Sequence, residues 1–179
     1  AVIPAGGLQQ AAQSVIGQNL GAGFVDRAHR ATWQGAAVAA GALGLLGAGQ
    51  WFLPELLVST LAPELSGRGV ELAVDYLRIL ALGYPAMGAM YLFQAGFNGA
   101  SRTKTSFAAS MAQYWGVRVP AAVLGTGVVL TGAWTLGVNA VFWAVTLSNV
   151  AAALGLAFYY YYSTEQGMLD RAAEDAAAA

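Results

Sequence analysis

Five side chains between residues 84 and 98 recur at steps of three and four, a spacing that places them on one face of a helix. They are Tyr84, Met87, Tyr91, Gln94 and Asn98, with Leu92 on the opposite face. Aromatic rings and a polarisable methionine suit flat organic cations, and amides are costly in hydrocarbon unless they face protein or a wet cavity. The stripe therefore predicts either a surface that binds substrate or amides that cross-link helices without touching a ligand.

A second stripe repeats this spacing later in the chain, at Thr135, Asn139, Phe142, Thr146 and Asn149. Here cross-linking is the favoured interpretation, with Asn139 and Asn149 kept as candidate substrate contacts. The first 20 residues hold a third polar set, Gln9, Gln10, Gln13 and Ser14. Between these segments, Ala40, Gly44 and Ala48 lie four residues apart, which is typical of close helix packing.

Arg118 is the only charge well inside an otherwise uncharged segment. An arginine at the centre of a membrane helix costs about 2.5–3.5 kcal/mol. The guanidinium is expected to snorkel, to bond backbone carbonyls, or to meet a carboxylate elsewhere. Pro120 removes a backbone donor and frees a carbonyl one turn earlier, which would offer a local acceptor. A structural role is favoured for Arg118 over a functional one.

Other kinds of site lack the residues they need. The chain has no cysteine and one histidine, His29, which is expected to be a solvated loop residue and not a metal ligand. Residues 17–23 are rich in glycine but lack the lysine and hydroxyl of a phosphate-binding loop. Glu55, Glu64, Glu71 and Asp75 lie in or beside one loop, where solvation is expected. The sequence therefore predicts no enzyme, no metal site and no cofactor, and a net charge of −1 disfavours nucleic acid as a partner.

The whole chain is unusually apolar. Charged residues make up 9% of it, against roughly 25% in soluble domains. Uncharged runs cover residues 1–25, 31–54, 79–101, 105–117 and 119–164. The last run is longer than one span of about 20 residues, so it must double back, at Thr131-Gly132-Ala133-Trp134. We therefore expect an all-α transmembrane bundle of five helices, at about residues 2–20, 32–53, 76–97, 105–130 and 135–162.

The basic residues set the expected orientation in the cell membrane. Loops near Arg27 and Arg102, together with the tail, hold five arginines and lysines, whereas the other side holds Arg68 and Arg78. Basic loops favour the cytoplasmic side. Glu64 is then expected outside, and residues 167–179 form a polar cytoplasmic tail that is either frayed helix or disordered. Because Ala1 starts within a helix, the chain is expected to be a fragment of a larger protein.

Several segments together resemble multidrug and toxic compound extrusion (MATE) transporters. The resemblance runs through residues 4–31, then YLRILALGYPAMG, then FNGASRTKTS in place of that family's glycine-alanine-glycine turn, then Val117–Pro120. It implies twelve helices in two six-helix lobes, of which residues 1–166 form helices eight to twelve of the second lobe. The first lobe is then a missing partner. In that family the carboxylates that bind sodium or protons lie mainly in the first lobe and in the helix before Ala1, so the coupling-ion site is expected outside this segment.

The resemblance implies an antiporter, driven by Na⁺ or H⁺, that exports organic cations or drugs by alternating access between the lobes. Gly83-Tyr84-Pro85 offers a bend point in the third span. The alternatives are a lipid-linked oligosaccharide flippase of related architecture, which a basic cavity would favour, and a non-transporting membrane assembly subunit. The latter would not need polar stripes on three helices.

Overall fold

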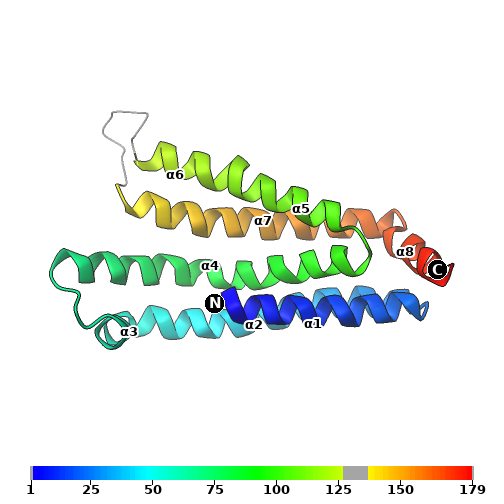
Figure 1. Ribbon diagram of the computed structural model, residues 1–179, viewed down its shortest axis with the longest axis horizontal. Helices are drawn as coiled ribbons and strands as arrows, with labels where there is room; N and C mark the ends of the chain where they lie inside the picture. The colour runs from blue at the N-terminus through cyan, green and yellow to red at the C-terminus, as the bar shows by residue number, and fades with distance from the viewer. Residues whose placement is uncertain (1, 127–136, 179) are drawn as a thin grey trace.

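The computed structural model describes residues 2–126 and 137–178, and within these ranges all regular structure is helical (Figure 1). The elements are α1 (Val2–Gly21), α2 (Val25–Phe52), α3 (Pro54–Leu61), α4 (Arg68–Gly99), α5 (Thr103–Met111), η1 (Ala112–Arg118), α6 (Val119–Thr126), α7 (Asn139–Glu165) and α8 (Met168–Ala177). The expected all-α bundle is confirmed. The turn predicted at Thr131–Trp134 and the start of the last span at Thr135 lie outside the described residues.

The long helices match the expected spans, with differences at their ends. Helix α4 begins eight residues earlier than expected and carries four charges in its first eleven residues. Its 32 residues extend about 48 Å, which exceeds a hydrocarbon core of about 30 Å. The short helix α3 was not expected. It starts where Leu53 leaves the helical conformation and Pro54 occupies the first helical turn, a position that proline favours.

The expected span at residues 105–130 is built from three consecutive pieces. Between α5 and α6, η1 is a π-helix, in which each N–H bonds the carbonyl five residues back. The Val119 N–H accordingly reaches the Tyr114 carbonyl. Pro120 follows directly, and its ring would clash with the carbonyl four residues earlier in a regular α-helix. The wider π-helical turn avoids that clash.

Helix α4 is the centre of the bundle, and it packs against α1, α2 and α7 (Figure 1). Glycines allow the closest approaches to α2: a Cβ on Gly88 would lie 2.5 Å from the Ala39 carbonyl oxygen, and one on Gly47 would lie 2.7 Å from that of Ala81. Pro85 removes the helical donor for the Ala81 carbonyl. The predicted packing stripe on α2 is thus displaced by one residue, because Ala48 is exposed and the contact runs through Ala39, Leu43 and Gly47.

A buried aromatic cluster joins α2, α4 and α7 near one end of the bundle. The fully buried Tyr160 hydroxyl donates to Thr32 Oγ1 over 2.9 Å, and its ring packs edge-on against Phe97. Gly96 leaves room for both Tyr160 and Thr32. His29 stacks on Tyr160 and accepts a hydrogen bond from the Trp33 indole. The expectation that His29 is a solvated loop residue is therefore wrong, since it lies half-buried in the first turns of α2.

The glycine-rich stretch that ends α1 is a helix stop. Phe24 N–H bonds the Asn19 carbonyl and Gly23 N–H bonds the Leu20 carbonyl, with Gly23 at φ 76°. This is the Schellman arrangement, which favours glycine at that position. The end of α4 repeats it, with Arg102 N–H on the Phe97 carbonyl and Ser101 at φ 59°. A serine therefore occupies a left-handed position that costs a non-glycine residue roughly 1 kcal/mol.

The two ends of the bundle differ in which connections they hold. The α1–α2 turn, the α4–α5 turn and α8 lie at one end, and α3 lies at the other (Figure 1). The expected tail forms the amphipathic helix α8, whose Met168 and Leu169 are buried against the bundle. Arg78 and Glu55 form a salt bridge of 2.8 Å at the α3 end. Two described helices, α2 and α7, are long and apolar enough to cross a membrane by length and composition.

Candidate functional site: a polar seam between four helices

Gln94 is the centre of a set of polar contacts inside the bundle. Its side chain is 8% exposed, accepts a hydrogen bond from Gln9 Nε2 and donates one to Ser110 Oγ, each over 3.3 Å. Ser106 Oγ donates to the Gln94 carbonyl. One amide on α4 thus connects α1 with α5. Both alternatives raised by the sequence fit this geometry, because the same amide cross-links helices and lies beside the exposed polar residues of α1.

Arg118 lies in a second set of contacts, between η1 and α7. Its Nε donates to Ser148 Oγ over 2.9 Å, and its Nη2 donates to Asn149 Oδ1 over 2.8 Å. Asn149 Oδ1 also accepts from Gln113 Nε2 over 2.7 Å, and the guanidinium stacks on the Tyr114 ring at 4.4 Å. The acceptors are therefore side chains of α7. The expectation that Pro120 supplies a local carbonyl is wrong, and neither snorkelling nor a carboxylate is needed.

The π-helix explains why Gln113 and Arg118 reach the same oxygen. Five residues apart on an α-helix, two side chains point about 140° away from each other, at about 100° per residue. In a π-helix, five residues close one hydrogen-bonded turn, so the two donors share a face. We call the two sets together the polar seam: Gln9, Gln94, Ser106, Ser110, Gln113, Arg118, Ser148 and Asn149. Ser106, Ser110 and Gln113 were not among the predicted site residues, although their spacing of four and three would have placed them on one helical face.

The other members of the α4 stripe lie in different surroundings. The Tyr84 hydroxyl donates to Gln50 Oε1 over 2.9 Å, which directs this residue to α2. Met87 is buried in the apolar core at 7% exposure. Tyr91 is half-buried one turn before Gln94. Leu92, expected on a less critical face, is 2% exposed, and a Cβ on Gly35 of α2 would lie 2.9 Å from its Cδ1. Substrate binding by the stripe stays a prediction, but the stripe's residues lie in different environments.

Asn98 lines a groove between α1 and α4 whose lining residues are mostly of polar type. The groove has a volume of about 390 Å³, and its lining residues are Gln10, Gln13, Ser14, Gly17, Gln18, Asn98 and Gly99. The glutamines and Ser14 are exposed. Close approach is possible here because Gly99 has no side chain: a Cβ at Gly99 would lie 2.7 Å from Ile16 Cγ2. The groove continues the polar surface of α1 from Gln9 toward the α1–α2 turn.

Asn139 lies apart from the seam, at the start of α7. Its Nδ2 donates to Asp75 Oδ2 over 3.1 Å, and this carboxylate belongs to the first turns of α4. The expectation that Asp75, in or beside the loop, is simply solvated is wrong, because its carboxylate accepts this hydrogen bond from α7. Further along α7, the Thr146 hydroxyl donates to the Ile79 carbonyl over 2.8 Å. Both contacts cross-link α4 and α7, as expected for the second stripe. Within the described residues, no group of three or more histidine or acidic side chains is placed to hold a metal ion.

Comparisons with known proteins point to one family. The MatE family model matches residues 1–124, which include α1 to α5 and η1. A curated relative, described as a probable multidrug resistance protein NorM of Pseudomonas aeruginosa, is 27% identical over 175 residues. These residues are 96% of this chain and 35% of the relative, so the chain spans about a third of the relative's length. No solved structure matches. The chain belongs to the MatE family of polytopic helical membrane proteins.

Proposed function

We propose that this chain is part of the second lobe of a transporter that exports organic cations or drugs, driven by inward flow of Na⁺ or H⁺. The two lobes alternate access to a central cavity, and the missing first lobe is the partner of this segment. The curated relative is described as a probable multidrug resistance protein, and this description supports export as the function. The oligosaccharide flippase is not favoured by these comparisons.

The observation that carries the proposal is the connected polar surface formed by Gln94, Gln9 and the glutamines of α1. Buried amides are retained at membrane depth only where they are paired or meet water or a ligand. This surface pairs Gln94 but leaves Gln10 and Gln13 exposed. An uncharged, amide-bearing surface suits a cation whose charge is balanced elsewhere, for example by a carboxylate of the other lobe.

The seam itself holds no carboxylate among the described residues, and we propose that the coupling-ion site lies outside this segment. The membrane orientation follows the basic loops. We propose that the end with Arg27, Arg102 and α8 faces the cytoplasm, and that α3 faces the outside.

Transport by the complete protein in inside-out vesicles tests the proposal. A fluorescent organic cation should accumulate when a Na⁺ or H⁺ gradient is applied, and collapse of that gradient should release it. Gln13→Leu, on the exposed part of the polar surface, should raise the substrate concentration for half-maximal transport about tenfold, as expected for the loss of roughly 1.4 kcal/mol of binding. The exposed Leu82→Ala on α4 is the matched control and should transport normally. Absence of gradient-driven accumulation by folded protein refutes the transport function, whereas normal transport by Gln13→Leu refutes only the assigned surface.

A further inference from the structure

An apolar groove of about 550 Å³ runs between α5–η1 and α7. Its walls are small or aliphatic side chains, Ala108, Ala109, Ala112 and Val117 on one side and Ala151, Ala152, Gly155 and Leu156 on the other. Lys104 lies at the end nearest the α4–α5 turn, and Gln113 is a polar residue deeper in the groove. No acidic side chain lines it.

A small polar pocket of about 140 Å³ adjoins the Lys104 end of this groove. The two cavities share Thr105 and Tyr159 as lining residues. The pocket adds Arg102 from the α4–α5 turn and Arg171 from α8, and no carboxylate lines it. Among the described residues the structure forms a salt bridge only between Arg78 and Glu55, at the opposite end. Lys104 thus lines the groove and Arg102 and Arg171 line the adjoining pocket, and none of the three forms a salt bridge within the part of the chain that the structure describes.

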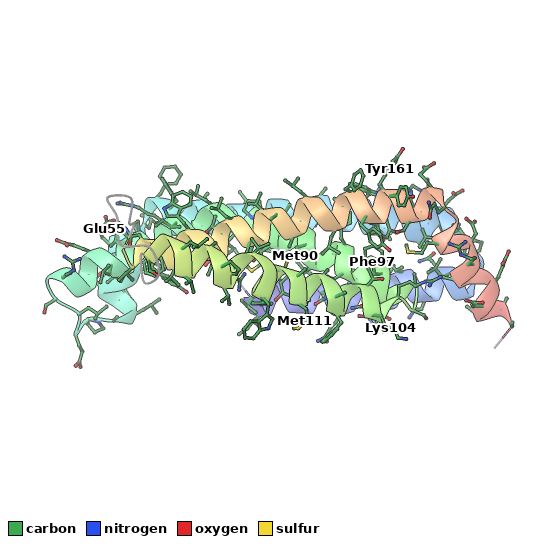
Figure 2. The ribbon with its side chains drawn as sticks, turned by 90° about the horizontal axis from the view of Figure 1, so that it is seen from above. Glu55, Met90, Phe97, Lys104, Met111 and Tyr161 are labelled. Atoms are coloured by element: carbon green, nitrogen blue, oxygen red, sulfur yellow. The ribbon has the colours of Figure 1, made fainter. Side chains whose placement is uncertain are left out.

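The dimensions fit one leaflet of a bilayer. From Lys104 to Ala112 the α-helical part rises about 12 Å at ~1.5 Å per residue, against about 15 Å for half of a ~30 Å hydrocarbon core. Lys104 on α5 and Tyr161 on α7 both lie toward the end of the bundle that holds α8 (Figure 2). Tyrosine residues at this level are typical of the membrane–water interface.

We propose that this composite cavity binds an anionic phospholipid. Its phosphate lies among Arg102, Lys104 and Arg171, and one acyl chain lies in the groove between α5–η1 and α7. Basic pockets between membrane helices recognise anionic headgroups in this way. The apolar groove distinguishes a lipid from a soluble phosphate, which would fill only the small pocket. The inference requires the helices to span a bilayer, but it does not depend on transport activity or on the coupling ion.

Native mass spectrometry of the complete protein in detergent tests the site. Protein is supplied with phosphatidylglycerol, with phosphatidylcholine, or with water-soluble glycerol phosphate, and retained molecules are counted. The double variant Arg102→Gln/Arg171→Gln should bind phosphatidylglycerol about 30-fold more weakly. Arg27→Gln/Arg30→Gln, which removes two charges from a different pocket at the same end, is its matched control.

A second variant tests the groove without touching a charge. A Cβ at Gly155 meets nothing within 4 Å, so Gly155→Leu fills the groove and should fold. Gly41→Leu, on α2 and equally open, is the control. Preferential phosphatidylglycerol binding that both test variants lose and both controls keep supports the proposal. Equal retention of the two lipids overturns it. So does a thermally stable Gly155→Leu that keeps the lipid, or glycerol phosphate that competes as strongly as the lipid, because either result leaves the groove without an occupant.

Discussion

Arg118 and Asn149 form the pair whose removal is most informative, because the two partners should not cost the same. The two charge-assisted hydrogen bonds of Arg118 contribute roughly 1.5–3 kcal/mol each. Against this total of roughly 3–6 kcal/mol stands a cost of about 2.5–3.5 kcal/mol for placing the arginine within the membrane. Arg118→Leu should therefore lower the free energy of unfolding by only about 1–2 kcal/mol.

The partners of Arg118 also stay satisfied in that variant. Asn149 Oδ1 still accepts from Gln113, and the Ser148 hydroxyl still donates to the Val145 carbonyl. Asn149→Leu is different, since it leaves the guanidinium with one of its two hydrogen bonds, that to Ser148, and deprives Gln113 of its acceptor. Leaving a buried donor such as the Gln113 amide without its acceptor costs about 1–3 kcal/mol, and more where the donor is charged, so the loss should exceed that of Arg118→Leu.

Thermal unfolding of the complete protein in detergent measures this asymmetry. Asn149→Leu should unfold at a clearly lower temperature than Arg118→Leu. The double variant Arg118→Leu/Asn149→Leu should be more stable than Asn149→Leu alone. Ser148→Ala, which removes one acceptor and leaves Asn149 in place, should fall between them. If Arg118→Leu is the most damaging single change, the charge itself stabilises the bundle and the cost assigned to its burial is wrong.

Three further predictions concern packing, a helix end and topology. Gly88→Ala should destabilise the protein by about 1–3 kcal/mol, because its Cβ would lie 2.5 Å from a backbone oxygen of α2; Gly41→Ala, which meets nothing, should be neutral or stabilising in the same thermal assay. Ser101→Gly should raise the free energy of unfolding by roughly 1 kcal/mol by relieving the left-handed backbone, and an unchanged midpoint would contradict that strain. In a cysteine-free background, single cysteines at positions 64 and 102 should react with a membrane-impermeant thiol reagent from opposite sides. Reaction of both from the same side would overturn the arrangement of α1 to α4 across the bilayer.

The helical bundle could be predicted from the sequence because uncharged runs set the lengths of its spans. The ends were less accessible. Helix α4 extends through Asp75 and Arg78, since charged residues form helix readily once the segment leaves the hydrocarbon, and nothing in the apolar pattern marks that extension. Helix α3 depends on a break at Leu53, which the apolar pattern does not show although the following Pro54 is compatible with it. The tail was expected to be polar, yet Met168 and Leu169 anchor it.

The residues of the polar seam were partly predictable. Gln94, Arg118 and Asn149 stand out because polar groups are rare in these segments. Their partners were hidden for a geometric reason, since Gln113 and Arg118 share a face only on a π-helix, and helical periodicity at 100° per residue separates them. Likewise Tyr84 and Gln94 share a stripe, but Tyr84 contacts α2 whereas Gln94 contacts α1.

The π-helix η1 also bears on how sequences of different length keep the same bundle. A single residue removed from an α-helix rotates everything beyond it by about 100°. The hydrogen-bonded ring of a π-helix already holds one residue more than that of an α-helix. Deletion of one residue within 112–117 therefore lets the segment close as an α-helix. The side chains of α5 and α6 then keep their orientation relative to the rest of the bundle. Homologous chains that lack one residue here are expected to align on both flanks and to lose the shared contact of Gln113 and Arg118. A one-residue gap at this place in an alignment therefore marks a change in the polar seam, not an error of register.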